Sequence, residues 1–348
     1  MILEAAAAAT AFVVSFLLIP VIIRYAREKN LLDIPGRRKI HKKLTPSLGG
    51  VAIFTGFLLS VLVWMEPSQW PHIRYFIVAQ GLIFFVGVRD DLLPLPPLYK
   101  LLGQVLASLI LVGFMDVRIH SFQGIFGIHE LPPWFSYLFT LFTIIVVTNS
   151  FNLIDGLDGL AGLLAVISSV ALGIWFMVAG DQAFAVMAFS LAGAAGAFLF
   201  FNWEPSKIFM GDTGALIIGF SLAVFVIRFI DSHLSLQVGS PARFASAASA
   251  GMGMIMIPLA DTLRVFIIRV LNRQSPFMAD KNHIHHSLLR LGLSHSRTSL
   301  LLGILQAAFI FLSVFMRNLP NSIALPLLLF PAVALSLLLA YLLRRKIV

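Results

Sequence analysis

Apolar runs separated by short polar stretches fill the chain, and eleven of these runs are candidates for membrane-crossing helices. A helix needs roughly 20 residues to cross a hydrocarbon core of about 30 Å. The runs cover residues 3–23, 48–65, 73–88, 100–115, 134–149, 159–179, 183–201, 213–230, 245–270, 299–316 and 320–343. This pattern predicts an all-α polytopic bundle of about eleven transmembrane helices that forms one domain over residues 1–348.

The composition also indicates a membrane protein. Hydrophobic residues make up 59% of the 348 residues and charged residues only 12%, whereas soluble domains carry about 25% charged residues. Because the chain has no Cys, disulfides, Cys-ligated zinc, iron–sulfur clusters and thiol catalysis are excluded.

The basic residues predict the orientation. With a periplasmic N-terminus, the cytoplasmic connections and the cytoplasmic C-terminus hold 20 of the 25 Lys and Arg residues, as the positive-inside rule describes. The net charge of +9 therefore reflects topology, and we expect no nucleic-acid partner. Ten of the sixteen acids fall on the same side, which that rule does not explain. We therefore expect the active-site loops on this face, at 24–47, 89–100, 150–158, 202–212 and 271–298.

Asp90 and Asp91 are adjacent acids at the end of the third apolar run. Mg²⁺ prefers such carboxylate oxygens and keeps waters or phosphates as its other ligands. A solvated helix end, with Arg89 as the counter-ion, explains the pair equally well.

Asn152, Asp155 and Asp158 lie between the fifth and sixth runs, in the sequence Asn-Leu-Ile-Asp-Gly-Leu-Asp-Gly. Turns favour Asp, Asn and Gly without any function. However, a tight polar loop before a helix also offers backbone N–H groups to anions and nucleotides. The crowding of amides and acids between two apolar helices favours this second interpretation.

A further polar connection runs from Asn202 to Asp212 and contains the aromatic Phe209. An N-cap role for Thr213 or Asp212 is one explanation, but nearby glycines let a ligand approach the backbone closely. Phe209 has little apolar core to join in a polar loop. We therefore expect Phe209 to stack on a base.

Asp261 and a histidine cluster are the last candidates. An acid within an apolar run is costly and is paired or functional by default, and pairing with Arg264 explains Asp261 as well as function does. The most polar connection holds a lysine and three histidines, at Lys281, His283, His285 and His286. Three His in four residues can bind zinc, but the Arg and Lys residues nearby favour an anion site.

Together these motifs resemble those of the polyprenyl-phosphate N-acetylhexosamine-1-phosphate transferases, the WecA/TagO/MraY-like membrane enzymes of glycosyltransferase family 4. The similarity extends from Lys42 to His286, with five motifs in the family order: Lys42–Gly50, Asp90–Asp91, Asn152–Gly159, Phe209–Asp212 and His283–His286. It implies ten or eleven helices in the bacterial cytoplasmic membrane, with the active site facing the cytoplasm. It also implies a lipid groove near a break in the ninth run, where Pro258 is consistent with a break.

By this resemblance the chain transfers HexNAc-1-phosphate from a UDP-sugar to undecaprenyl phosphate and releases UMP, which starts a lipid-linked cell-surface polysaccharide. The implied cofactor is Mg²⁺, with Mn²⁺ as a substitute. Whether the chain forms a homodimer is left open. The expected metal ligands are Asp212, Asp90 and Asp91. The expected catalytic residues are these three acids with His283, His285 and His286. The expected substrate-binding residues are Lys42, Lys43, Asn152, Asp155, Asp158, Asn202, Phe209 and Lys281.

Two departures refine the resemblance. Many members carry a third acid in Asp-Asp-x-x-Asp, but this chain has Pro94 there. The muramoyl-pentapeptide branch has three consecutive His, whereas this chain has His-Ile-His-His. That spacing resembles the WecA-like branch, which starts O-antigen, enterobacterial common antigen, teichoic acid and capsule chains, and implies UDP-GlcNAc or a related UDP-HexNAc.

The chemistry joins two anionic phosphates, so metal, cations and positioning are the expected remedies for charge repulsion. The second pKa of a phosphate ester is about 6, so the acceptor needs no strong base. Direct displacement at the β-phosphorus is our hypothesis, and a double displacement through an aspartyl-phosphate is left open as the alternative.

Three other classes of function fit the sequence less well. A secondary transporter would place acids at mid-bilayer in two matching halves. An intramembrane protease would need paired acids or His-Glu-x-x-His, and a scaffold would not need clustered carboxylates.

Overall fold

The computed structural model describes residues 1–29, 31–33, 45–237, 239–275 and 283–347. The predicted substrate-binding residues Lys42, Lys43 and Lys281 lie outside these ranges. Within them the helices are α1 (Ile2–Glu28), α2 (Gly49–Trp64), α3 (Trp70–Leu92), α4 (Pro97–Phe114), α5 (Pro133–Ile154), α6 (Leu160–Ala179), α7 (Gln182–Asn202), α8 (Gly211–Ser232), α9 (Ala247–Gly253), α10 (Met256–Leu271), α11 (Ile284–Arg290), α12 (His295–Phe315) and α13 (Asn321–Ile347). Two-residue strands β1 (Leu32–Asp33) and β2 (Thr45–Pro46) form one antiparallel pair, and η1 (Pro67–Gln69) and η2 (Ile125–Gly127) are 3₁₀ turns.

Every predicted apolar run forms helix, so the all-α prediction is confirmed apart from the short strand pair. In the described part of the chain, eight helices are long and apolar enough to cross a membrane: α1, α4, α5, α6, α7, α8, α12 and α13. α2 is apolar but shorter, at 16 residues. The chain is therefore a multi-pass membrane protein.

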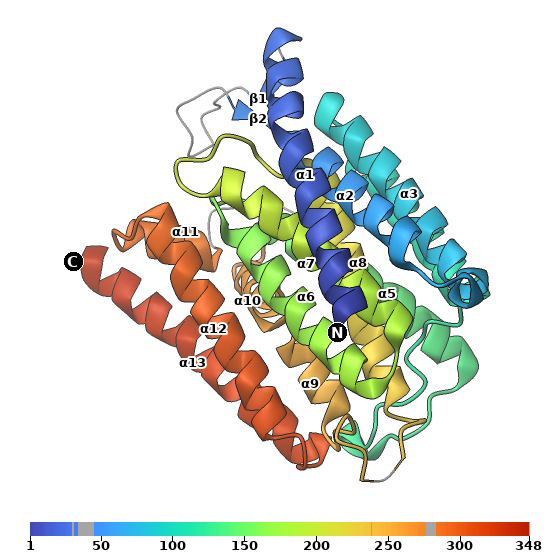
Figure 1. Cartoon of the computed structure of the whole chain (residues 1–348). Coiled ribbons are helices and arrows are strands. Elements are labelled where there is room, and N and C mark those ends of the chain that lie inside the picture. The colour runs from blue at the N-terminus through green and yellow to red at the C-terminus, as the bar shows by residue number, and fades with distance from the viewer. Residues whose placement is uncertain (30, 34–44, 238, 276–282, 348) are drawn as a thin grey trace.

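α8 is the centre of the bundle. In its most apolar 18-residue window, 94% of the residues are buried, against 22% in α13 at the edge. α8 packs against α2, α3, α5, α6 and α9, while α12 and α13 lie side by side along one edge of the bundle (Figure 1). A helix that is apolar on all sides is expected to be surrounded by others, and this central place lets the start of α8 meet several neighbours.

The segments that connect the helices lie at the two ends of the bundle, where polar side chains link them to one another. At one end Lys100 reaches Asp212, and Glu204 accepts hydrogen bonds from Ser296 N and Oγ at 2.7 and 2.8 Å. At the other end Arg228 pairs with Asp181 at 2.8 Å. This arrangement is the alternation that the sequence predicts, and it brings the acid-rich connections to one end.

The ninth apolar run is broken, but not at Pro258. α9 ends at Gly253 and α10 begins at Met256, so Pro258 lies in the first turn of α10, where its missing N–H costs no helical hydrogen bond. Gln306 of α12 closes the break: it accepts from Ile257 N at 3.0 Å and donates to the carbonyl oxygens of Gly253 and Met254 at 3.0 and 2.8 Å. Interrupted backbone at membrane depth is tolerated where neighbours satisfy it in this way.

Several helices extend into segments that the sequence assigns to loops. α3 continues to Leu92 and therefore includes Asp90 and Asp91, and α5 continues to Ile154 and includes Asn152. Apolar periodicity ends before the helix does, because the last turns reach polar surroundings. The predicted loops 89–100 and 150–158 are accordingly shorter, and their side chains are held on helix ends.

Candidate active site

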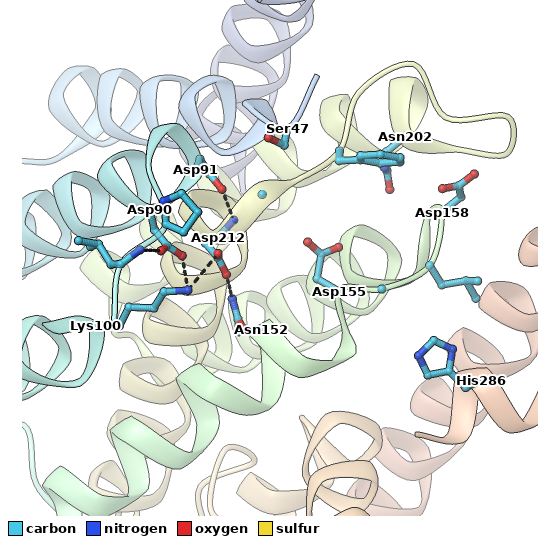
Figure 2. Close-up of a pocket in the computed structure, with 16 residues that line it drawn as sticks. Ser47, Asp90, Asp91, Lys100, Asn152, Asp155, Asp158, Asn202, Asp212 and His286 are labelled. Atoms are coloured by element: carbon cyan, nitrogen blue, oxygen red, sulfur yellow. Dashed lines mark hydrogen bonds and ion pairs between the residues drawn. The ribbon is translucent and has the colours of Figure 1, made fainter. Parts of the chain in front are cut away.

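A cavity of about 540 Å³ opens at the acid-rich end of the bundle. Its lining combines the ends of α3 and α5, the starts of α4 and α8, the connections around them, and α11. Figure 2 shows these side chains, which come from distant parts of the sequence. Nine of the predicted site residues line it: Asp90, Asp91, Asn152, Asp155, Asp158, Asn202, Phe209, Asp212 and His286. His283 and His285 are buried and are not among the lining residues.

Lys100 joins two carboxylates at one side of the cavity. Its Nζ contacts Asp90 Oδ2 and lies 3.2 Å from Asp212 Oδ2. Asn152 Nδ2 donates to the other oxygen of Asp212, and Leu95 N donates to Asp90 Oδ1 at 2.6 Å. Two acids held this close need a cation, and the Lys100 ammonium supplies it.

Asp91 holds the start of α8. One of its oxygens accepts from Asp212 N at 2.7 Å, and the other accepts from Thr213 N and Oγ1 at 3.1 and 2.5 Å. The first N–H groups of a helix have no partner within it, and a carboxylate there also interacts favourably with the helix dipole. Gly211, with a φ of +72°, leaves room for this carboxylate, because a Cβ at Gly211 would lie 2.6 Å from Asp91 Oδ2. The glycine thus admits a protein side chain, which the sequence interpretation did not foresee.

Asp155 differs from the other aspartates that line the cavity, each of which accepts a hydrogen bond from the protein. Within the described ranges no hydrogen bond holds its carboxylate, which lines the cavity and is directed into it in Figure 2. Loss of water, and then the nearby charges of Asp212, Asp91 and Asp158, raise its pKa to about 8. At neutral pH this side chain is therefore largely the neutral acid, and a cation or a hydrogen-bond donor brought by a ligand would favour its ionised form.

Asn202 and Asp158 hold the loops around the cavity. Asn202 Oδ1 accepts from Gly159 N at 2.8 Å, and its Nδ2 donates to the Ile208 carbonyl at 2.8 Å. Asp158 Oδ2 accepts from Ser206 N at 3.4 Å and lies 3.5 Å from His295 Nδ1. The Asn202 amide is therefore occupied on both sides, although both residues line the cavity.

Phe209 is fixed through its backbone. Its N–H donates to the Pro46 carbonyl at 2.8 Å, and its carbonyl accepts from Gly49 N at 3.0 Å. The side chain is half-buried and lines the cavity. A ring on a backbone held at both groups is a rigid surface for stacking.

Asp261 organises the histidine motif. It is 1% exposed, and its two oxygens accept from Ile284 N at 2.7 Å and contact His283 Nδ1 at 2.9 Å. His285 is also 1% exposed, and burial lowers its pKa to about 3. It is therefore neutral at physiological pH and is packed under the loop at Gly156. His286, whose ring is tilted against that of His285 with ring centroids 4.3 Å apart, is the member of the motif that lines the cavity.

Sequence reasoning missed Lys100, counting it only as a charge that sets topology. A signal was present: Lys100 lies in the first turns of a predicted helix, where the helix dipole disfavours a cation. Such a lysine needs an acidic partner, and Asp90 precedes it by ten residues in the sequence.

The described side chains contain no group of three His, Cys, Asp or Glu that would enclose a metal ion by themselves. Mg²⁺ does not require such a cage, because it is usually held by one or two carboxylates together with waters and substrate phosphates. Asp212, Asp90 and Asp155 offer oxygens of the right kind around one cavity. The donor set therefore fits Mg²⁺ bound jointly with a phosphate-bearing substrate.

Comparison with known proteins gives a consistent result. Residues 73–230 match the sequence model of the family described as Glycosyl transferase family 4. A probable undecaprenyl-phosphate N-acetylglucosaminyl 1-phosphate transferase of Bacillus subtilis is 31% identical over 316 residues, which cover 88% of this chain and 84% of the relative. Undecaprenyl-phosphate alpha-N-acetylglucosaminyl 1-phosphate transferases of Yersinia pestis and Escherichia coli K12 are each 28% identical, over 80% and 82% of this chain and 75% and 76% of the relatives.

Proposed function

Because the chain belongs to glycosyl transferase family 4 and is a membrane phosphotransferase, we propose that it transfers N-acetylglucosamine 1-phosphate from UDP-N-acetylglucosamine to undecaprenyl phosphate. The cavity itself supports this proposal best. It combines carboxylates for a metal, a lysine and an aromatic ring at one end of an apolar bundle. A lipid phosphate can reach such a site from the membrane and a nucleotide sugar from water.

Mg²⁺ would be held by Asp212 and Asp90, with Asp155 available as a further oxygen donor. When bound, Mg²⁺ neutralises the charge that develops on the transferring phosphoryl group. Lys100 holds both carboxylates in place, and its ammonium is a cation for substrate phosphate. Asp91 acts one step further away, because it fixes the start of α8 and thereby the backbone of Asp212.

The proposed reaction is a single displacement. A phosphate oxygen of undecaprenyl phosphate attacks the β-phosphorus of the UDP-sugar, and the bond from that phosphorus to the bridging oxygen breaks. UMP leaves with the bridging oxygen, so no proton has to move. The protein contributes orientation and positive charge, which dominate catalysis of phosphoryl transfer.

The nucleotide would lie between Phe209 and Asp158. The Phe209 ring offers a stacking face for uracil, and Asp158 lines the same cavity. His286 faces this cavity from α11 and would donate a hydrogen bond to the pyrophosphate or sugar. His283 and His285 would position His286 and the 155–158 loop, so the structure favours indirect roles for two residues that the sequence assigned to catalysis.

The finer topology is part of the proposal. α2, α3 and the broken α9–α10 pair would complete eleven crossings beside the eight long apolar helices. The cavity would face the cytoplasm of a bacterial inner membrane, with the N-terminus periplasmic. A cysteine introduced at Ser232 should be labelled by an impermeant reagent from outside, and one at Ser206 should not. The reverse pattern would turn the cavity away from UDP-sugars.

UMP release by the purified protein tests the function. With Mg²⁺ and undecaprenyl phosphate, UDP-N-acetylglucosamine should give UMP and a lipid-linked sugar, and chelation of the metal should stop both. A panel with UDP-N-acetylgalactosamine, UDP-glucose and UDP-muramoyl-pentapeptide reads the specificity. Preference for another UDP-HexNAc would change only the proposed sugar specificity. If none of the UDP-sugars gave UMP, the transferase proposal would be refuted.

A further inference from the structure

A second cavity lies between the end of α1 and the end of α7. It has a volume of about 420 Å³ and shares no lining residue with the candidate active site. Its polar rim is formed by Arg24, Arg27 and Glu28 of α1 and by Lys207 of the connection between α7 and α8. Because α1 and α7 both end here after crossing the apolar region, this cavity is at the level where membrane meets water.

The three basic residues at this cavity carry an excess of positive charge. In the described parts of the chain, no ion pair or side-chain hydrogen bond engages Arg24, Arg27 or Lys207. All three are exposed, and Glu28 alone opposes them among the lining residues. Three cations converging on one cavity without partners are suited to an anion.

The inner wall of the same cavity is apolar and continues toward the membrane interior. Pro20, Ile23 and Phe201 line it. Below them, Phe16 packs against Phe200 and Phe201 with ring centroids 5.3 and 5.0 Å apart, and Phe200 is 63% exposed. The cationic rim is therefore continuous with an aromatic surface that faces lipid, so a polar head and an apolar tail fit it together.

We propose that this cavity binds the phosphate of an anionic glycerophospholipid, with its acyl chains along the aromatic wall of α1 and α7. Basic pockets between helices on the cytoplasmic side are suited to acidic lipid head groups. The undecaprenyl phosphate acceptor is the weaker choice, because its phosphate has to reach Asp212 and Asp90 in the other cavity. This site does not depend on the proposed reaction.

The site has a consequence for the loop that carries Phe209. Lys207 N donates to the Phe201 carbonyl at 2.9 Å, and Phe209 follows two residues later with its backbone bound to Pro46. A lipid phosphate on the Lys207 side chain would add an anchor to this loop from the membrane side. The lipid is therefore placed to stabilise the connection between α7 and α8.

Native mass spectrometry of the purified full chain tests the site. Phosphatidylglycerol is titrated into the detergent-solubilised protein, with phosphatidylcholine as the neutral glycerophospholipid. Two variants each lose three positive charges, one at the cavity (R24Q, R27Q and K207Q) and a matched control at the C-terminal end of α13 (R344Q, R345Q and K346Q). Near an acidic lipid each charge contributes about fivefold in affinity, so the cavity variant, which loses three charges, should bind phosphatidylglycerol roughly a hundredfold more weakly. The control should stay within about twofold of wild type.

Equal losses in both variants would overturn the proposal, because they would show only general electrostatic attraction. Displacement of phosphatidylglycerol by equimolar undecaprenyl phosphate would assign the cavity to the acceptor, and displacement by inorganic phosphate would assign it to a free anion. The single exposed change K207Q serves if the triple variant does not fold, with a loss of about fivefold expected and unchanged affinity as the contradicting result.

Discussion

The two sides of the active-site cavity treat their charged side chains differently. On the acid side, Asp90, Lys100 and Asp212 pair with one another while they line the cavity. On the histidine side, Asp261 is bonded to His283 and to the start of α11, and His285 is buried beside them. The first arrangement can exchange partners when a ligand arrives, whereas the second is part of the packing.

The contrast shows that a dense polar motif is not by itself a set of contacts to substrate. The acid side needs its charges because two carboxylates share a cation. The histidine side uses a carboxylate to start a short helix and to place one histidine, His286, at the cavity. Removing a charge should therefore lower catalysis on the acid side and lower stability on the histidine side.

The largest effect is expected for Asp212→Asn. The change removes a charge with little change in volume, and a lost electrostatic contact to a transferring phosphoryl group should lower kcat by about 10²–10³ or more. Initial rates of UMP release measure it. A rate within about threefold of wild type would move the metal to Asp90 and Asp155.

Asp91→Asn is the matched control for Asp212→Asn. An amide has one accepting oxygen, so at least one N–H at the start of α8 would lose its partner, at a cost of about 1–3 kcal/mol of stability. Thermal unfolding in detergent should show a larger loss for Asp91→Asn than for Asp212→Asn. If both variants keep wild-type stability and lose kcat equally, Asp91 belongs to the reacting centre.

The next effect concerns Phe209, an aromatic residue that lines the cavity. Base–aromatic stacking contributes about 1–3 kcal/mol by alanine substitution. If this is uniform binding energy, Phe209→Ala should raise KM for the UDP-sugar by roughly fivefold to over a hundredfold and leave kcat nearly unchanged. A loss of kcat at constant KM would show that the ring positions Asp212 and does not contact the base.

A smaller difference is expected between two adjacent histidines. His286→Gln should lower kcat/KM roughly threefold to tenfold, the effect of one hydrogen bond to the substrate. His285→Gln should change kcat/KM less but lower the unfolding temperature more, because His285 is buried. Steady-state rates and thermal unfolding of both variants separate the roles, and the opposite ranking would place His285 in contact with substrate.

Much of the fold follows from the sequence because apolar runs and charge asymmetry are properties of single segments. Helix ends are harder, since Asp90, Asp91 and Asn152 lie in final helical turns whose polar residues stop the apolar pattern before the helix stops. The sequence predicts a break in the ninth run near Pro258, but the interruption lies upstream, between Gly253 and Met256, and depends on Gln306 from another helix. Such a long-range partner is not visible in a local pattern.

The candidate site divides in the same way. Residue types predict that acids and amides meet on one face, and nine predicted residues do line one cavity. Which acid is capped, paired or open depends on neighbours that meet only in three dimensions. Asp91 accepts a hydrogen bond from the start of α8, and Asp261 accepts one from the start of α11. Lys100 of α4 forms an ion pair with Asp90.

The smallest effect is the pH dependence of stability that His285 contributes. Burial lowers its pKa in the folded protein to about 3, whereas an unfolded chain binds the proton at a pKa of about 6.5. Between these values the unfolded state holds more protons, so the free energy of unfolding should decrease as the pH falls from about 6.5 toward 3. His285→Gln removes this contribution. The free energy of unfolding of this variant should therefore vary less steeply with pH across that interval, and the difference in slope should correspond to at most about one bound proton. The His286→Gln variant is the control, because it keeps His285 and should keep the slope. Identical slopes in wild type and His285→Gln would mean that His285 is protonated in the folded protein, and the histidine side would then carry charge in the same way as the acid side.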